Sequence, residues 1–188
     1  MKMTKHILAL AMGLLLNAHL TNAQTVQQAP KLPVDEKTGL ITYTKVTEVA
    51  GTTAGVLYQR AMEWANKYYK NPTDVIRERD SVGGQIVCKA RFKIMNPADK
   101  KGVATDAGNV MYTLKVQFKD GRYRYELSEV NWKQQSYYPC ERWMDKTVQT
   151  YKPEFDFYLQ QTDTSIREAL KSMEKALATA TAVKKDDW

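Results

Sequence analysis

The stretch that decides the fold is residues 110–127, VMYTLKVQFKDGRYRYEL, in which apolar and polar residues alternate on both sides of a turn. Asp120-Gly121 at its centre is typical of a two-residue β-hairpin turn. Because alternate residues of a strand point to opposite faces of its sheet, the pattern predicts two antiparallel strands with one apolar and one basic face. The residues expected on the apolar face are Tyr112, Leu114, Val116, Phe118, Tyr123, Tyr125 and Leu127.

Three further strands are expected before this hairpin. Residues 85–95, QIVCKARFKIM, alternate in the same way. The polar segment Val75–Val82 predicts a short edge strand that turns back at Gly83-Gly84, and residues 40–49 are rich in the β-branched residues that strands favour. In the 85–95 strand the inward residues are expected to be Ile86, Cys88, Ala90, Phe92 and Ile94.

Two amphipathic helices are expected to cover the apolar face of this sheet. The first follows an N-cap at Thr52 or Thr53 and stops at Asn71-Pro72. The second is expected to begin at a capping box formed by Ser165 and Glu168. The apolar stripes consist of Leu57, Ala61, Trp64 and Tyr68 in the first helix and of Ile166, Leu170, Met173 and Leu177 in the second.

The segment between the hairpin and the last helix, residues 134–163, carries many aromatic residues. We interpret it as a wrapping segment that covers the core and contains a short helix with Pro139 in its first turn; the alternative is that its aromatic residues line a ligand groove. The resulting order, β-α-β-β-β-β-α, predicts one α+β domain over residues 39–183, with an antiparallel sheet of about five strands and helices packed on one face.

The N-terminal residues 1–23 have the pattern of a secretory signal peptide. Lys2 and Lys5 precede the apolar run Ile7–Leu16, which is too short to span a bilayer, and small residues lead to a cleavage site near Ala23. We therefore expect a periplasmic or secreted protein without a transmembrane segment. Residues 24–38 are expected to be a flexible lead-in and residues 184–188 a frayed tail.

Removal of the signal peptide would leave a chain without histidine, because His6 and His19 both lie within it. The net charge would fall from +7 to +5, since the segment contains two lysines and no acidic residue. These facts argue against Ser-His-Asp and Cys-His nucleophiles and against histidine-ligated metal sites, so we expect no catalytic residue, metal or cofactor. For Cys88 and Cys140 we favour two free thiols over a disulfide.

Three stretches of the chain support a family resemblance: residues 32–41, the hairpin segment 119–125, and KPEFDFYL at 152–159. Together they resemble an exported bacterial family that is catalogued as a domain of unknown function with a TBP-like fold. The resemblance implies a sheet with helices on one face, and it brings no activity and no site residues. Nucleic-acid binding is not expected, because the chain has one copy of the unit, lacks phenylalanine on its expected outward face and leaves the cytoplasm.

The candidate binding residues are the basic side chains expected on the outward face of the sheet. They form either an ordinary solvated face or a surface for an acidic partner such as an acidic glycan, a lipid headgroup or an envelope protein. The residues are Lys89, Arg91, Lys93, Lys115, Lys119, Arg122 and Arg124.

Three classes of function follow from the sequence. The first is an exported, non-catalytic binding or envelope-associated module. The second is a structural or assembly subunit that pairs through an exposed strand edge near Val75–Val82. The third is a hydrolase that relies on carboxylates alone.

Overall fold

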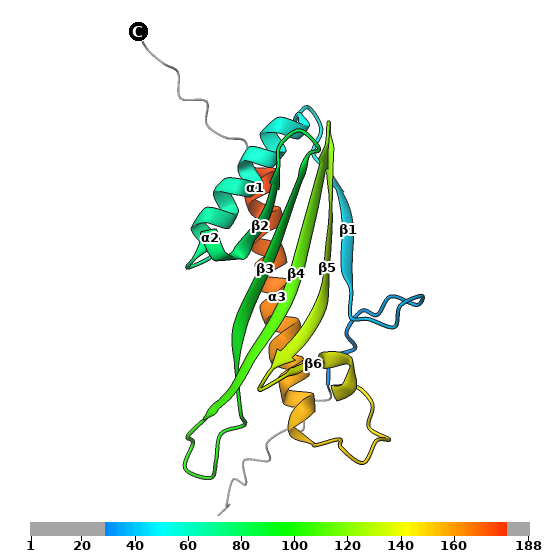
Figure 1. Cartoon of the computed structure of the whole chain (residues 1–188), viewed down its shortest axis with the longest axis vertical. Helices are drawn as coiled ribbons and strands as arrows, with labels where there is room; N and C mark the ends of the chain where they lie inside the picture. The colour runs from blue at the N-terminus through cyan, green and yellow to red at the C-terminus, as the bar shows by residue number, and fades with distance from the viewer. Residues whose placement is uncertain (1–28, 180–188) are drawn as a thin grey trace, which may run out of the picture.

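The computed structural model describes residues 29–179, which form one antiparallel sheet with helices packed against it (Figure 1). The strand order is β1-β5-β4-β3-β2, and β6 pairs with β5. The strands are β1 (Tyr43–Glu48), β2 (Ile76–Asp80), β3 (Gln85–Met95), β4 (Asp106–Lys119), β5 (Arg122–Lys133) and β6 (Tyr137–Pro139). The helices are α1 (Ala54–Tyr68), α2 (Pro72–Val75), the 3₁₀-helix η1 (Cys140–Trp143) and α3 (Glu154–Ala178).

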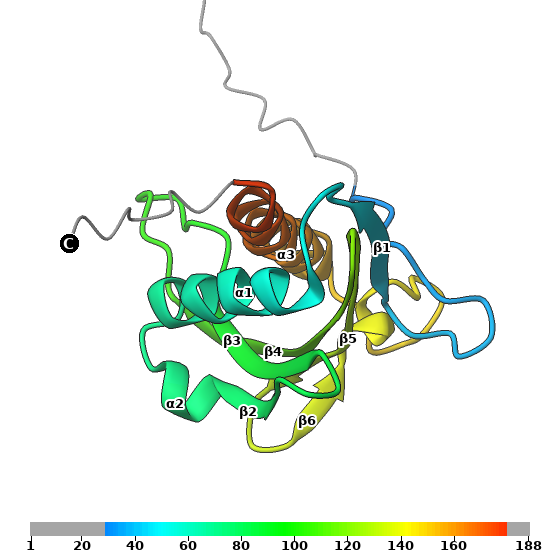
Figure 2. The same ribbon diagram turned by 90° about the horizontal axis from the view of Figure 1, so that it is seen from above.

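The α1 and α3 helices lie on the same face of the sheet, as Figure 2 shows from above. This inner face carries the core, and the seven hairpin residues predicted to point inward are all buried. In β3 the prediction holds for four of the five inward residues, whereas Phe92 is only half-buried. The predicted α+β class, with an antiparallel sheet and helices on one face, is confirmed.

The α1 helix begins where the sequence predicted. The Thr53 side chain accepts a hydrogen bond from the Val56 backbone N–H (3.3 Å), which satisfies one of the donors that a helix start leaves free. Tyr68, expected in the core, is instead 42% exposed and stacks on Trp64 at the surface. Its neighbour Tyr69, just beyond the helix, is buried in its place.

The start of the last helix was predicted wrongly. α3 begins at Glu154, so Ser165 lies inside the helix and does not cap it. The last third of the expected wrapping segment is therefore helical, whereas Pro139 does precede a short helical turn, η1. Glu154 and Asp156 in the first turn of α3 favour this start, since negative charge stabilises a helix N-terminus.

A bulge in β5 changes which residues face the core. Glu129 has a left-handed backbone conformation (φ 55°), and together with Val130 it stands opposite the single residue Tyr112 of β4. Inward residues are odd-numbered up to Leu127 and even-numbered from Val130 onward. Trp132 consequently points inward, where its indole N–H donates to the Ala107 carbonyl oxygen (2.8 Å).

Part of the expected lead-in belongs to the domain. Leu32 is buried in the core, and Val34 forms an isolated β-bridge with Ile41. The expected signal peptide and frayed tail lie outside the described residues. Over residues 29–179, no helix is both long and apolar enough to cross a membrane.

A basic groove along strand β3

The sheet register places the seven predicted basic residues on its outward face. Lys119 stands opposite Arg122, and Lys115 stands opposite Glu126. On the neighbouring strand β3, Lys89 lies two residues beyond the residue that pairs with Lys115. Six of the seven are exposed and Lys115 is half-buried. They do not form one cluster, because three lie in a groove beside β3, three lie at the hairpin end, and Lys115 lies between the two groups.

The groove beside β3 is the larger hollow on this face. It has a volume of about 1060 Å³ and lies between β3 and the segment that joins α1 to β2. We call it the basic groove and define it by its five basic lining residues. These are Lys70, Arg77, Lys89, Arg91 and Lys93.

The charge of the basic groove is only partly balanced. Lys89 contacts Glu129 (3.4 Å) and Lys93 contacts Asp106 (2.7 Å), whereas Asp74 is the one carboxylate among the lining residues. Within residues 29–179 no ion pair involves Lys70, Arg77 or Arg91. Three of the five cations are therefore available to an external anion.

The two acidic partners are held in their ionised form. Hydrogen bonding to Lys93 and to the Gly108 backbone N–H lowers the pKa of the Asp106 carboxyl below its ordinary value. The Thr113 hydroxyl, which donates to Glu129 Oε2 (2.6 Å), is the main cause that lowers the pKa of Glu129, and the charge of Lys89 adds to it. Both carboxylates thus remain charged at neutral pH and position the lysines at the rim of the basic groove.

The walls of the basic groove are apolar as well as basic. Ala90 and Phe92 line it from the inner side of β3, and Met111 lines it from β4. On the opposite wall Tyr69 and Val75 contribute. A ligand here would meet an apolar surface on one side of the β3 edge and positive charge on the other, a combination that suits an amphipathic partner.

The hairpin end of the same face is shallower. A hollow of about 330 Å³ is lined there by Lys119, Arg122 and Arg124 together with Gly83 and Gly84. Arg124 contacts Glu126 along its own strand (3.3 Å). These three basic residues share the outward face with the basic groove, but they surround less space.

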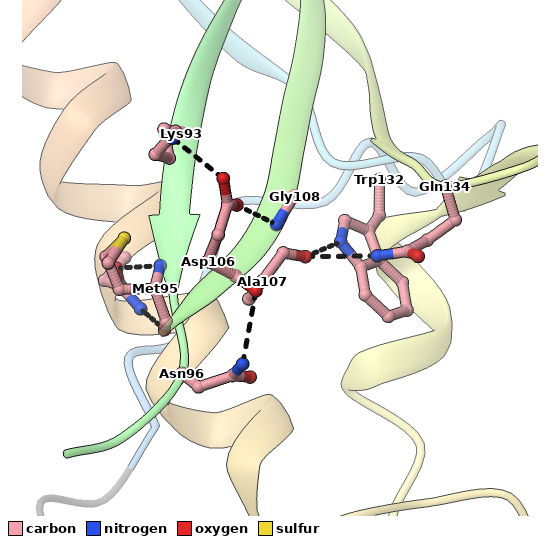
Figure 3. A network of polar contacts seen from close by, with 9 residues as sticks. Lys93, Met95, Asn96, Asp106, Ala107, Gly108, Trp132 and Gln134 are labelled. Atoms are coloured by element: carbon pink, nitrogen blue, oxygen red, sulfur yellow. Dashed lines mark hydrogen bonds and ion pairs between the residues drawn. The ribbon is translucent and has the colours of Figure 1, made fainter. Parts of the chain in front are cut away.

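A polar network fixes the far end of the sheet (Figure 3). The Ala107 carbonyl oxygen accepts from the Trp132 indole and from Gln134 Nε2 (3.1 Å). Gly108 has φ 102°, and a β-carbon there would lie 3.2 Å from the Lys133 carbonyl oxygen, so the close approach of β4 and β5 requires glycine. The network holds Asp106, and through it Lys93, in a defined position.

The aromatic segment after β5 leaves the outward face open. Trp143 of η1 packs on Trp132 (5.5 Å between ring centroids) and on Tyr158 of α3 (5.5 Å). This cluster is on the helical side of the sheet, where Trp143 and Tyr158 are buried. It does not cover the basic residues, which keep their exposure.

Possible metal ligands and thiols lie within the described residues. Within residues 29–179 no group of three or more His, Cys, Asp or Glu side chains is arranged to hold a metal ion. Cys88 and Cys140 are both buried and unpaired, as favoured from the sequence. Burial raises the pKa of the Cys88 thiol to about 12, which is far from the range of a reactive thiol.

Sequence analysis missed two members of the basic groove, Lys70 and Arg77. They flank α2, a one-turn helix that the sequence did not predict, although Pro72 at its start was noted as the end of α1. Only the packing of this turn against the β3 edge brings them to the groove. A local signal existed, since Asn71-Pro72-Thr73-Asp74 resembles a helix start.

Comparison with known proteins supports the resemblance drawn from the sequence. Residues 43–133 match the profile of a family described as "Domain of unknown function (DUF4468) with TBP-like fold". The chain carries a DUF4468 domain. The match spans β1 to β5 and therefore includes all seven predicted basic residues, while α3 lies outside it.

Two crystal structures share the fold of this chain. One is a TBP-like protein from Parabacteroides distasonis (TM-score 0.61, 15% identity, covering 79% of this chain and 98% of that one). The other is a DUF4468 family protein from Bacteroides ovatus (TM-score 0.61, 16% identity, covering 82% and 92%). A search of curated proteins gives no match. The predicted TBP-like fold is confirmed, and the family description names no activity.

Proposed function

We propose that this protein is an exported, non-catalytic module that binds an acidic partner in the basic groove. The observation that carries the proposal is the gathering of five basic residues around one hollow of about 1060 Å³, where only one lining residue is acidic. Concave sites concentrate electrostatic potential, so this surface attracts anions more strongly than a flat face of equal charge. The signal-peptide pattern of residues 1–23 supports export.

The experiment is a matched pair of charge reversals on the same face. Arg77→Glu with Arg91→Glu changes the basic groove, and Lys119→Glu with Arg122→Glu changes the hairpin end by the same net charge. Neither pair removes an ion pair within the described chain. The probes are labelled poly-glutamate, a sulfated glycan and vesicles of phosphatidylglycerol, measured at low salt by fluorescence anisotropy or co-sedimentation.

We expect the groove pair to weaken binding of an anionic probe about tenfold or more and the hairpin pair to weaken it less than about threefold. Raising the salt from roughly 50 to 200 mM should reduce binding of the wild-type protein, since exposed charges are screened. Equal losses in both pairs would mean that net charge alone attracts the probe, and the proposal would then be wrong.

A further inference from the structure

The β3 edge that borders the basic groove has no strand beside it. The register between β2 and β3 ends at Cys88, whereas β3 continues to Met95. Over residues 29–179 no strand pairs with the side of β3 that faces away from β4 beyond Cys88. The two basic residues of this bare stretch that lie farthest from β2 are Arg91 and Lys93.

The hydrogen-bond pattern shows where the backbone groups of this edge point. The Phe118 N–H donates to the Gly84 carbonyl oxygen (2.8 Å), one step before the Gln85–Gln117 pair. In an antiparallel ladder, successive residues of a strand bond alternately to one side and the other. Even-numbered residues of β3 therefore bond β4, and Arg91 and Lys93 direct their N–H and C=O groups to the open side.

The end of the same edge is closed by a side chain. The Met95 N–H donates to Gln161 Oε1 (2.9 Å), and Gln161 Nε2 donates to the Met95 carbonyl oxygen (2.9 Å). The carboxamide of Gln161 thus occupies the position of a paired strand at Met95. This contact supports the assignment of odd-numbered residues to the open side, and it leaves Arg91 and Lys93 as the bare part of the ladder.

We propose that the basic groove takes an extended polypeptide strand, which pairs antiparallel with β3 at Arg91 and Lys93 and carries acidic side chains opposite these two residues. The inference rests on the proposed function and names its ligand class. Directly paired residues of neighbouring strands point to the same face. The acidic residues would thus face the basic side of the β3 edge, and the intervening apolar residue would face Phe92 on the inner side.

A second copy of this chain is a poor occupant of the edge. Antiparallel pairing of two β3 strands about Arg91 would place Arg91 opposite Arg91 and Lys89 opposite Lys93. Like charges that stand directly opposite in a sheet are destabilising. The same charges that block self-association are complementary to an acidic strand, as in other domains that accept an added strand at a sheet edge.

The test uses a labelled peptide in which glutamate and valine alternate, together with two N-methylated forms of it. A strand that pairs antiparallel to β3, with its glutamates opposite Arg91 and Lys93, points the glutamate N–H groups at these two residues and the valine N–H groups away. Methylation of two glutamate backbone nitrogens removes the N–H groups that bond to β3, so it should weaken binding about tenfold or more. Methylation of two valine backbone nitrogens should change binding little. Both forms keep the charge of the parent and have the same composition as each other.

Hydrogen exchange provides a second measurement on the protein itself. Bound peptide should slow exchange of the Arg91 and Lys93 amides, while the Ala90 amide, already bonded to β4, should change little. Equal affinity of the two methylated forms would overturn strand pairing. If poly-glutamate or the sulfated glycan still depends on Arg77 and Arg91 in that case, the proposed function stands without it. If no probe depends on them, both proposals fall.

Discussion

The two faces of one sheet differ in what their side chains contribute. On the inner face Leu114 and Leu127 are fully buried beneath the helices, whereas one residue further along each strand Lys115 and Ser128 are only half-buried. The inner face is continuous, and the outward face is divided into a basic groove and a shallower hairpin end. Apolar burial therefore explains stability, while the position of charge around a hollow explains where a ligand would bind.

The largest expected effect comes from shifting the register of β5 after the bulge. Deleting Asn131 would place Trp132 directly after Val130, which turns Trp132 to the outward face and Lys133 to the inner face. Trp132 packs on Trp143 and donates to the Ala107 carbonyl oxygen, so we expect a loss on the order of 5 kcal/mol or more, measured by urea unfolding.

The control for this deletion is Glu129→Gly, which keeps the residue count. Glycine adopts the left-handed conformation of this position without steric cost, so stability should change by no more than about 1 kcal/mol. If the protein that lacks Asn131 unfolds no more easily than the glycine variant, the inward position of Trp132 does not contribute to stability.

The bulge also marks the limit of what alternation in the sequence could predict. Both faces were assigned correctly up to Leu127, because burial of one face enforces a period of two. The next apolar residues, Val130 and Trp132, follow at spacings of three and two, which is the local signal of an inserted residue. The alternation predicted for this strand ended at Ser128, so the changed spacing of Val130 and Trp132 was not used.

The start of α3 was missed although its signal was present. Phe155, Tyr158, Leu159 and Thr162 already have the spacing of one helical face, but the polar run around Ser165 resembles a cap more strongly. Tertiary packing decides in favour of the longer helix, since Tyr158 and Leu159 are buried. The basic groove could not be predicted from the sequence, because it forms only when α2 packs against the edge of β3.

A second contrast between the faces lies in neighbouring residues of β5. Tyr123→Ala should cost about 3–5 kcal/mol, because its ring is 1% exposed and replacement leaves a cavity. Arg122→Ala should stay within about ±0.5 kcal/mol, since its side chain is exposed. Thermal and denaturant melts of both variants measure this, and a more harmful arginine change would mean that the strand is oriented the opposite way.

A third contrast concerns thiol reactivity at neighbouring positions of β3. Burial raises the pKa of the Cys88 thiol to about 12, so it should react with a disulfide reagent at least about a hundredfold more slowly than a free cysteine near pH 8. Cys140 is buried as well, and its pKa is also raised. The outward substitution Lys89→Cys should restore fast reaction at one thiol. Rapid labelling of the folded wild-type protein would show that the inner face opens to solvent.

The smallest expected effect concerns the outward contacts of Glu129. Its pKa is lowered in the folded protein, chiefly by the Thr113 hydroxyl and then by Lys89, so the ionised carboxylate is the form that stabilises the fold. Such a contribution is present above the unfolded pKa, about 4.3 for glutamate, and disappears as the pH falls through the folded value. Because the site is exposed, Glu129→Gln should cost only about 0.2–1 kcal/mol near pH 7.

The difference between wild type and Glu129→Gln should accordingly shrink as the pH is lowered below about 4, and it should not grow above neutrality. A cycle with Thr113→Val isolates the hydroxyl contact, since the two changes should be less than additive if Thr113 acts through Glu129. Glu129→Gln is also expected to loosen Lys89, which lines the basic groove, without altering Arg91. A pH-independent difference, or full additivity with Thr113→Val, would separate this residue from the charge balance of the outward face and leave it with the backbone bulge as its only role.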